Sequence, residues 1–212
     1  MIPENFARRI TRLGAGGLII SGAALGYSYV SHPHLMTPAV IAGPGWVIIH
    51  ALFALSLVLG LMATVAVYAS TALHSGWTGL VGCATLFVGM MMIFGLDYYE
   101  VFIAPYLARH YPSVIVDHGA GDAMGAVALA FPVAGFLTVS GYALLGWAWL
   151  RAEVYPRSVM LALILTSIAF GIGLSPIGGL MTARITAAGF GAALISVGFA
   201  AWRNSDAQRG LT

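Results

Sequence analysis

Apolar residues dominate this chain in long and nearly unbroken stretches. Between Arg12 and Asp97 the sequence contains no Asp, Glu, Lys or Arg. A helix that crosses the hydrocarbon core of a bilayer needs about 20 apolar residues, so this stretch alone accommodates three such helices and two short turns. The pattern therefore predicts an all-α fold made of membrane-spanning helices.

Polar and proline-rich segments divide the apolar stretches into six predicted spans. Prolines and histidines between Ser31 and Gly43 mark the first turn, the residues from Ser70 to Gly76 mark the second, and Ser-Pro-Ile-Gly-Gly at 175–179 marks the last. The predicted spans cover residues 13–31, 44–69, 77–97, 118–150, 158–175 and 180–202. We therefore expect a single membrane domain, 1–212, built as a six-helix bundle.

Two features distinguish the second half of this bundle. The connection at 98–117 is the only sizeable loop that the pattern predicts. Pro132 lies inside the fourth span, where its ring removes one backbone hydrogen bond and is expected to bend the helix.

Arginine placement predicts the orientation, because basic residues are retained on the cytoplasmic side of a membrane. With the N-terminus inside, seven of the nine arginines lie on that side and only Arg109 and Arg184 lie at or near the outer side. Both termini are thus predicted to be cytoplasmic, in a bacterial inner (plasma) membrane. The segments 32–43, 98–117 and 175–179 then face the periplasm or the cell exterior.

Composition excludes several classes of protein. Hydrophobic residues make up 60% of the chain and charged residues only 8%, which leaves too little polar surface for a soluble enzyme, a nucleic-acid binder or a disordered segment. The net charge of +2 indicates no polyanionic partner. Membrane lipid is the partner that the composition requires, and a protein partner or a second copy of the chain stays open.

Familiar catalytic motifs are missing from the sequence. It contains no GxSxG, no HExxH, no Walker A loop and no cysteine pair, since Cys83 is the single cysteine. The sequence therefore names no reaction, and whether the protein is an enzyme stays undecided.

Most ionisable residues away from the cytoplasmic ends fall at one predicted depth, near the outer ends of four helices. The candidate ligand- or ion-binding residues in this layer are His50, Asp97, Glu100, Asp122 and Arg184. Charges within a bilayer are costly and usually face the bundle interior or a wet cavity, so this layer predicts a polar pocket open to the outer side. Asp122 and Arg184 lie within predicted helices and would compensate each other as a salt bridge.

A metal ion or haem b is the cofactor alternative. His118 and Asp122 are spaced i, i+4 and would share a helix face, so that with His50 they form a candidate metal site. A b-type haem would use His50 with His118, or with a methionine of the run 90–92, as its axial ligands. Tyr98, Tyr99 and Tyr106 would then act as a lid over the pocket and admit an amphiphile such as a quinone.

One resemblance adds to this picture. The segment Glu100–Ala108 after a glycine-rich helix, together with Gly45-Trp46 and His50, resembles a loose group of small, uncharacterised bacterial multi-helix membrane proteins. The resemblance implies six helices and no activity.

Three functional hypotheses remain open on the sequence. The first is a small ligand or ion bound in the outer pocket, by a transporter or by the membrane subunit of a larger assembly. The second is a haem- or metal-containing redox protein that uses quinone. The third is a structural subunit whose polar layer only fixes the register of its helices.

Overall fold

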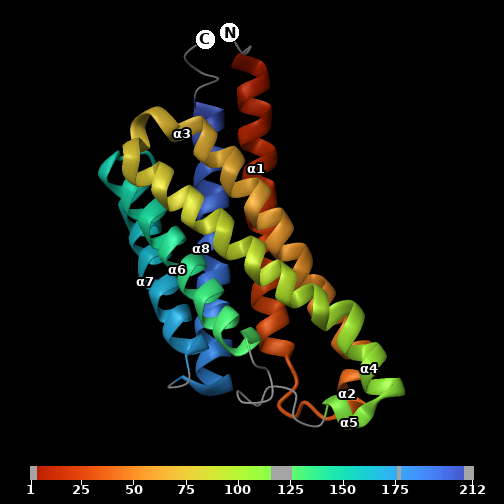
Figure 1. Cartoon of the computed structure of the whole chain (residues 1–212). Helices are drawn as coiled ribbons and strands as arrows, with labels where there is room; N and C mark the ends of the chain where they lie inside the picture. Colours follow the sequence, from red (N-terminus) through yellow and green to blue (C-terminus); the bar gives the residue numbers. More distant parts are fainter. Residues whose placement is uncertain (1–3, 116–125, 176–177, 208–212) are drawn as a thin grey trace.

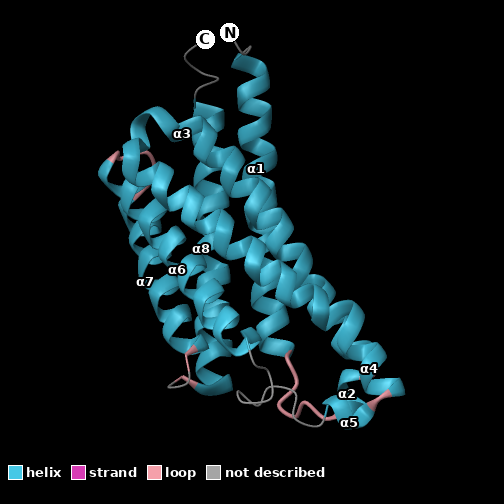
Figure 2. Ribbon diagram, viewed as in Figure 1, coloured by secondary structure: helices cyan, strands magenta, loops and turns pink. Residues whose placement is uncertain are grey.

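The computed structural model describes residues 4–115, 126–175 and 178–207, and every regular element within these ranges is a helix (Figure 2). The elements are α1 (Glu4–Ser31), α2 (Pro38–Ile41), α3 (Pro44–Tyr98), the π-helix η1 (Tyr99–Ile103), α4 (Ala104–His110), α5 (Pro112–Ile115), α6 (Ala126–Arg151), α7 (Arg157–Leu174) and α8 (Gly179–Ala207).

Five of the described helices are long and apolar enough to cross a membrane. They are Phe6–Ser31, Pro44–His110, Leu129–Arg151, Arg157–Leu174 and Gly179–Asp206. A soluble chain of this size does not carry five such segments, because each needs about 20 apolar residues. The protein is therefore a multi-pass membrane protein.

The longest helical segment, α3, reverses its direction at Gly76. The backbone of Gly76 has φ 57° and ψ −158°, values that only glycine adopts without strain. Figure 1 shows the two limbs of α3, residues 44–75 and 77–98, running back alongside each other. The reversal falls at the end of the segment Ser70–Gly76, where the sequence predicts a turn.

Close glycine contacts bring the helices together. Gly22 of α1 meets the backbone of Gly191 in α8, and Gly26, one turn further along α1, also lies against Gly191. Gly141 of α6 lies against the second limb of α3, where an added Cβ would come within 2.6 Å of the Leu86 Cα atom. Small residues at these points allow backbones to approach, which is the usual basis of helix packing in lipid.

The start of α1 and the end of α8 lie at the same end of the bundle (Figure 1). There Arg12 reaches Asp206 at 3.6 Å and stacks over Trp202 at 4.7 Å. The helices α1 and α8 extend beyond the predicted 13–31 and 180–202, to Glu4 and Ala207, and these contacts join the two extensions. We call the opposite end of the bundle the distal end.

The distal end differs from the predicted loop at 98–117. Residues 99–110 continue the second limb of α3 as η1 and α4, and α5 follows at Pro112–Ile115. Pro105 lies in the first turn of α4, where a proline is tolerated because its missing N–H has no helical partner there. The wide π-helical turn before it absorbs the change in register, so the proline does not end the helix.

A small second core holds this distal extension in place. Five buried residues from α2, α3, α4 and α5 form it: Ile41, Trp46, Ala104, Ala108 and Ile115. The Arg109 guanidinium also donates to the Ala42 carbonyl oxygen, at 2.8 Å from Nη2 and 3.2 Å from Nε. The start of α3 is therefore fixed against η1 and α4, which sets the position of the residues described next.

Candidate functional site

His50 and Asp97 form a buried pair between the two limbs of α3. Their atoms Nδ1 and Oδ1 are 2.6 Å apart although the residues are 47 positions apart in the chain. The residues are only 8% and 3% exposed, respectively. The reversal at Gly76 brings them together, because it returns the second limb to the depth of the first.

The pair leaves one polar atom of each residue without a hydrogen bond. Among the described residues, three buried side-chain nitrogen or oxygen atoms have no partner: His50 Nε2, Asp97 Oδ2 and Arg184 Nε. Unsatisfied buried polar atoms are costly and usually mark a missing ligand, water or proton. Two of the three belong to one hydrogen-bonded pair, which makes it the strongest candidate site in the described part of the chain.

Aromatic rings surround the imidazole of His50. The Trp46 ring lies against it with centroids 4.5 Å apart and planes tilted by 34°. The Trp46 Nε1–H donates to the Glu100 carbonyl oxygen at 3.0 Å, which ties the first limb to η1. The His32 ring meets both of these rings edge-on, 5.3 Å from Trp46 and 5.4 Å from His50.

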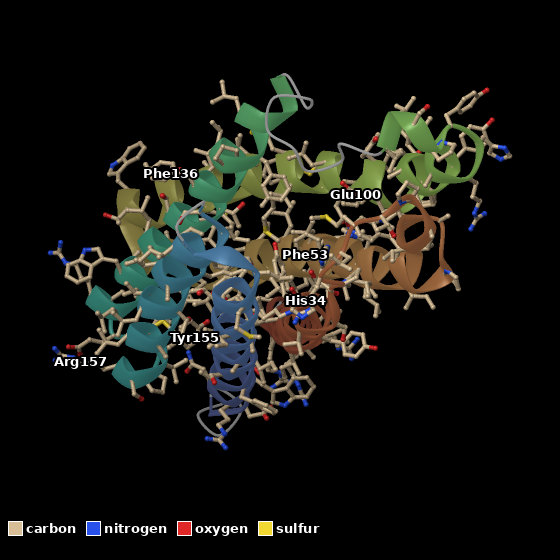
Figure 3. All side chains as sticks on the ribbon, turned by 90° about the horizontal axis from the view of Figure 1, so that it is seen from below. His34, Phe53, Glu100, Phe136, Tyr155 and Arg157 are labelled. Atoms are coloured by element: carbon tan, nitrogen blue, oxygen red, sulfur yellow. The ribbon has the colours of Figure 1, made fainter. Side chains whose placement is uncertain are left out.

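Residues 32–37, which we call the strap, lead from α1 across the distal end to α2. Arg184 of α8 holds the strap by donating to the His32 carbonyl oxygen and, at 2.7 Å, to Nε2 of His34. An arginine has no acceptor atom, so His34 must accept this bond with an unprotonated Nε2. Figure 3 looks onto this end of the bundle, with His34, Phe53 and Glu100 near the middle of the view.

His32 is the point where the charged groups of the site meet. Burial lowers the pKa of His32, and the positive charges of His50 and Arg184 act in the same direction. The Pro33 carbonyl, to which His32 Nδ1 is hydrogen-bonded at 3.0 Å, and the negative charge of Glu100 oppose this shift. The lowered pKa favours neutral His32 in the folded protein.

Several hydroxyl groups lie in the mainly apolar bundle interior below the pair. A cavity of about 20 Å³, enough for roughly one water molecule, begins one turn below His50 and Asp97 and is bordered by Tyr29, Ser21, Ser56 and other residues. The Ser21 hydroxyl donates to the Ser56 carbonyl at 2.8 Å. Tyr29 lies near enough to Asp97 to interact with its charge.

Further along the bundle, polar contacts link α3 to α6. The Tyr142 hydroxyl is 3.5 Å from Thr64 Oγ1, and Trp149 Nε1–H donates to Thr71 Oγ1 at 2.8 Å. Apolar residues that are fully buried separate these two contacts along each helix, Val67 in α3 and Leu145 in α6. Two polar contacts thus lie inward of the pair, with an apolar layer between them.

The structure brings four of the predicted binding residues to this end of the bundle. His50 and Asp97 are in direct contact, and Glu100 and Arg184 both act on His32 beside them. Arg184 is bound to the strap, and Asp122, its predicted salt-bridge partner, lies outside the described residues.

The metal and haem hypotheses remain predictions. His118 and Asp122 lie outside the described residues, and within them no group of three or more His, Cys, Asp or Glu residues is placed to hold a metal ion. A haem iron would have to reach His50 Nε2, beside which Trp46 and His32 pack. We assign no metal ligand among the residues that the structure describes.

The tyrosines of the predicted lid lie along a helix. Tyr98 and Tyr106 are about half exposed and pair with Phe102 and His110 on the same helical segment. Tyr99 packs against the small distal core. Their rings therefore lie on the distal extension. None of their described ring contacts is with His50 or Asp97, so these contacts do not support a lid role.

Sequence analysis gave no role to two residues of the site, Trp46 and Tyr29, and considered His32 only as a possible further metal ligand. Trp46 and His50 are spaced i, i+4 and so share a helix face, which was a usable signal. His32 was recognisable only as a loop histidine before a proline. Tyr29 had the pattern of any aromatic residue in an apolar helix.

Comparisons of the chain with protein-family models, with curated proteins and with solved structures find no match, so the function is inferred from the residues alone.

Proposed function

We propose that this protein binds and releases a proton at the His50–Asp97 pair and couples that proton to the movement of a small ligand or ion across the membrane. The proposal includes six membrane crossings, with the two limbs of α3 counted separately, and cytoplasmic termini. The distal end then faces outward. The arginine distribution supports this orientation, and the buried pair with its two unpartnered atoms carries the functional part.

The chemistry of the pair favours a proton as its ligand. With Asp97 ionised, Oδ1 accepts from Nδ1–H of His50, and Nε2 is then either bare or protonated. A bare Nε2 leaves a net negative charge in a buried setting, whereas a protonated Nε2 makes the pair neutral overall. A single proton therefore changes the net charge of the pair between −1 and 0.

Two neighbours adapt the pair to this exchange. The electron-rich face of the Trp46 indole stabilises a positive imidazole, which lowers the cost of the protonated form. A proton also needs no cavity of its own, so the close packing around His50 is no obstacle to it. Buried acid and histidine residues of this kind are typical of proton-coupled membrane proteins.

The test is to count the protons that the purified protein binds. Detergent-solubilised protein is titrated between acid and alkaline pH, with nitrogen NMR of labelled histidine to follow His50 Nε2. We expect Asp97→Asn and His50→Gln each to remove about one proton per chain from the titration. Asp206→Asn serves as the matched control, since it changes an exposed carboxylate that faces Arg12 at the other end.

Two results would overturn the proposal. One is a His50 Nε2 signal that stays unprotonated throughout the pH range in which the protein is folded. The other is a proton count in Asp97→Asn that equals the wild-type count while Asp206→Asn loses its single surface proton as designed.

A further inference from the structure

We propose that His32 relays the proton between the outer solution and the His50–Asp97 pair. This inference rests on the proposed function and adds its route of access. His32 was not among the residues that the sequence singled out for the pocket, and the geometry gives it a role of its own.

The position of His32 suits a relay. It follows the last residue of α1, is neither fully buried nor fully exposed, and its ring lies 5.4 Å from that of His50 at an angle of 78°. The two rings are in edge-to-face contact, so a small rotation of either ring, or one intervening water molecule, would connect their nitrogens for proton transfer. His32 therefore bridges a solvent-facing loop and a buried acceptor.

The hydrogen bonds of His32 select the nitrogen that exchanges. Nδ1–H donates to the Pro33 carbonyl oxygen at 3.0 Å, so Nε2 is the atom that takes up a proton. The step is balanced: an acid in solution gives one proton to His32 Nε2, the resulting imidazolium gives one proton to His50 Nε2, and His32 returns to its neutral form. The Nδ1–H bond to Pro33 is kept throughout.

The charges around His32 make its protonation transient. Glu100 on η1 favours the protonated ring, while His50 on α3 and Arg184 on α8 disfavour it, and His34 on the strap is held by the same arginine. Burial is the largest of these effects, and it lowers the pKa of His32. His32 is therefore neutral in its resting state, and a proton that it accepts is readily passed on.

The relay predicts a change in rate without a change in equilibrium. Proton uptake after a rapid pH jump is followed with a pH-indicator dye in weakly buffered solution. We expect His32→Gln to slow uptake by the pair by about 100-fold, within the range for loss of a positioned proton-transfer group. The number of protons bound at equilibrium should not change, because His50 and Asp97 are intact.

Two additions separate a relay from a packing role. His32→Phe keeps a ring against Trp46 and His50, so it should fold like the wild type and still take up protons slowly. Free imidazole in solution should restore the rate in both variants, since a diffusible base replaces the missing one. His110→Gln, an exposed histidine on α4, is the matched control and should keep the wild-type rate.

The possible outcomes are distinguishable. If Asp97→Asn removes a proton but both His32 variants keep the wild-type rate, the relay is wrong and the proposed function stands. If the slow rate of both variants is not restored by imidazole, His32 acts by packing and the relay is also wrong. If Asp97→Asn removes no proton, the proposed function itself has failed.

Discussion

The indole of Trp46 and the imidazole of His50 pack against each other with their planes tilted by 34° and their centroids 4.5 Å apart, one helical turn apart on α3. The same indole donates its Nε1–H to the Glu100 carbonyl at 3.0 Å. One side chain thus supports the buried histidine and also fastens the start of α3 to the π-helix that follows its second limb. The proposed proton site and the distal extension therefore share an anchor.

The first prediction separates these two roles of Trp46. Trp46→Phe keeps an aromatic face against His50 but removes the donor to Glu100, so we expect a loss of about 1 kcal/mol of stability, typical of one hydrogen bond. Proton binding by the pair should persist. Trp46→Ala also removes the ring and should cost about 3–5 kcal/mol. Reversible unfolding in mixed detergent micelles measures both, and equal losses in the two variants would contradict this division.

The second prediction concerns the energetic coupling between His50 and Asp97. Removing one partner leaves the other buried without its hydrogen bond, so Asp97→Leu and His50→Leu should each destabilise the fold by about 3–5 kcal/mol. The double variant, which buries two apolar side chains, should lose much less than the sum of the two. A double-mutant cycle from the same unfolding measurements gives the coupling directly. Additive losses would show that the two residues act independently.

The sequence predicts most of the fold for a simple physical reason. Segments free of charge over about 20 residues must be helical in lipid, because no other single segment satisfies its own backbone there. The arginines and the acidic residues then mark where each charge-free segment ends. The prediction of a loop at 98–117 was wrong. Pro105 and a cluster of tyrosines are typical of a loop, but here a π-helical turn accommodates the proline and the helix continues.

The site was predictable only in part. His50 and Asp97 stand out because charged or ionisable residues are rare in the apolar stretches. Their pairing depends on the depth at which Gly76 returns the second limb, which composition does not fix. The partners of Arg184 depend on how the strap crosses the distal end, and no local pattern encodes a contact between residues 150 positions apart.

The third prediction is that the strap loosens in acid. The folded state lowers the pKa of His32 below its ordinary value of about 6.5. The strap packed on the bundle therefore binds fewer protons than a strap that has detached from it. Its attachment is fully stable above about pH 6.5 and becomes weaker as the pH falls.

A spin label on the strap tests this prediction. Met36 is exposed on the strap, so Met36→Cys in a Cys83→Ala background gives a single labelling site. The label should become more mobile as the pH falls below about 6.5. Arg184→Gln should make it mobile at every pH. A label whose mobility is the same in acid and at neutral pH would exclude a strap held by neutral histidines.

The last prediction concerns the close approach of α6 to the second limb of α3. A Cβ added at Gly141 would lie 2.6 Å from both Cα and Cβ of Leu86, which are backbone or backbone-attached atoms that cannot rotate away. Gly141→Ala should therefore force the helices apart and destabilise the protein by about 1–3 kcal/mol. Because Tyr142 and Trp149 reach Thr64 and Thr71 from the same helix, their hydrogen bonds should weaken with it.

Gly95 on the same limb of α3 is the matched control for this substitution. A Cβ at Gly95 meets no atom within 4 Å, so Gly95→Ala changes only the helix propensity and should leave stability equal or raise it by about 0.5–1 kcal/mol. Unfolding in mixed micelles compares the stabilities of the two variants. If Gly141→Ala is as stable as Gly95→Ala, α6 does not pack on α3 at this distance. The hydroxyl contacts below His50 would then lose their structural basis.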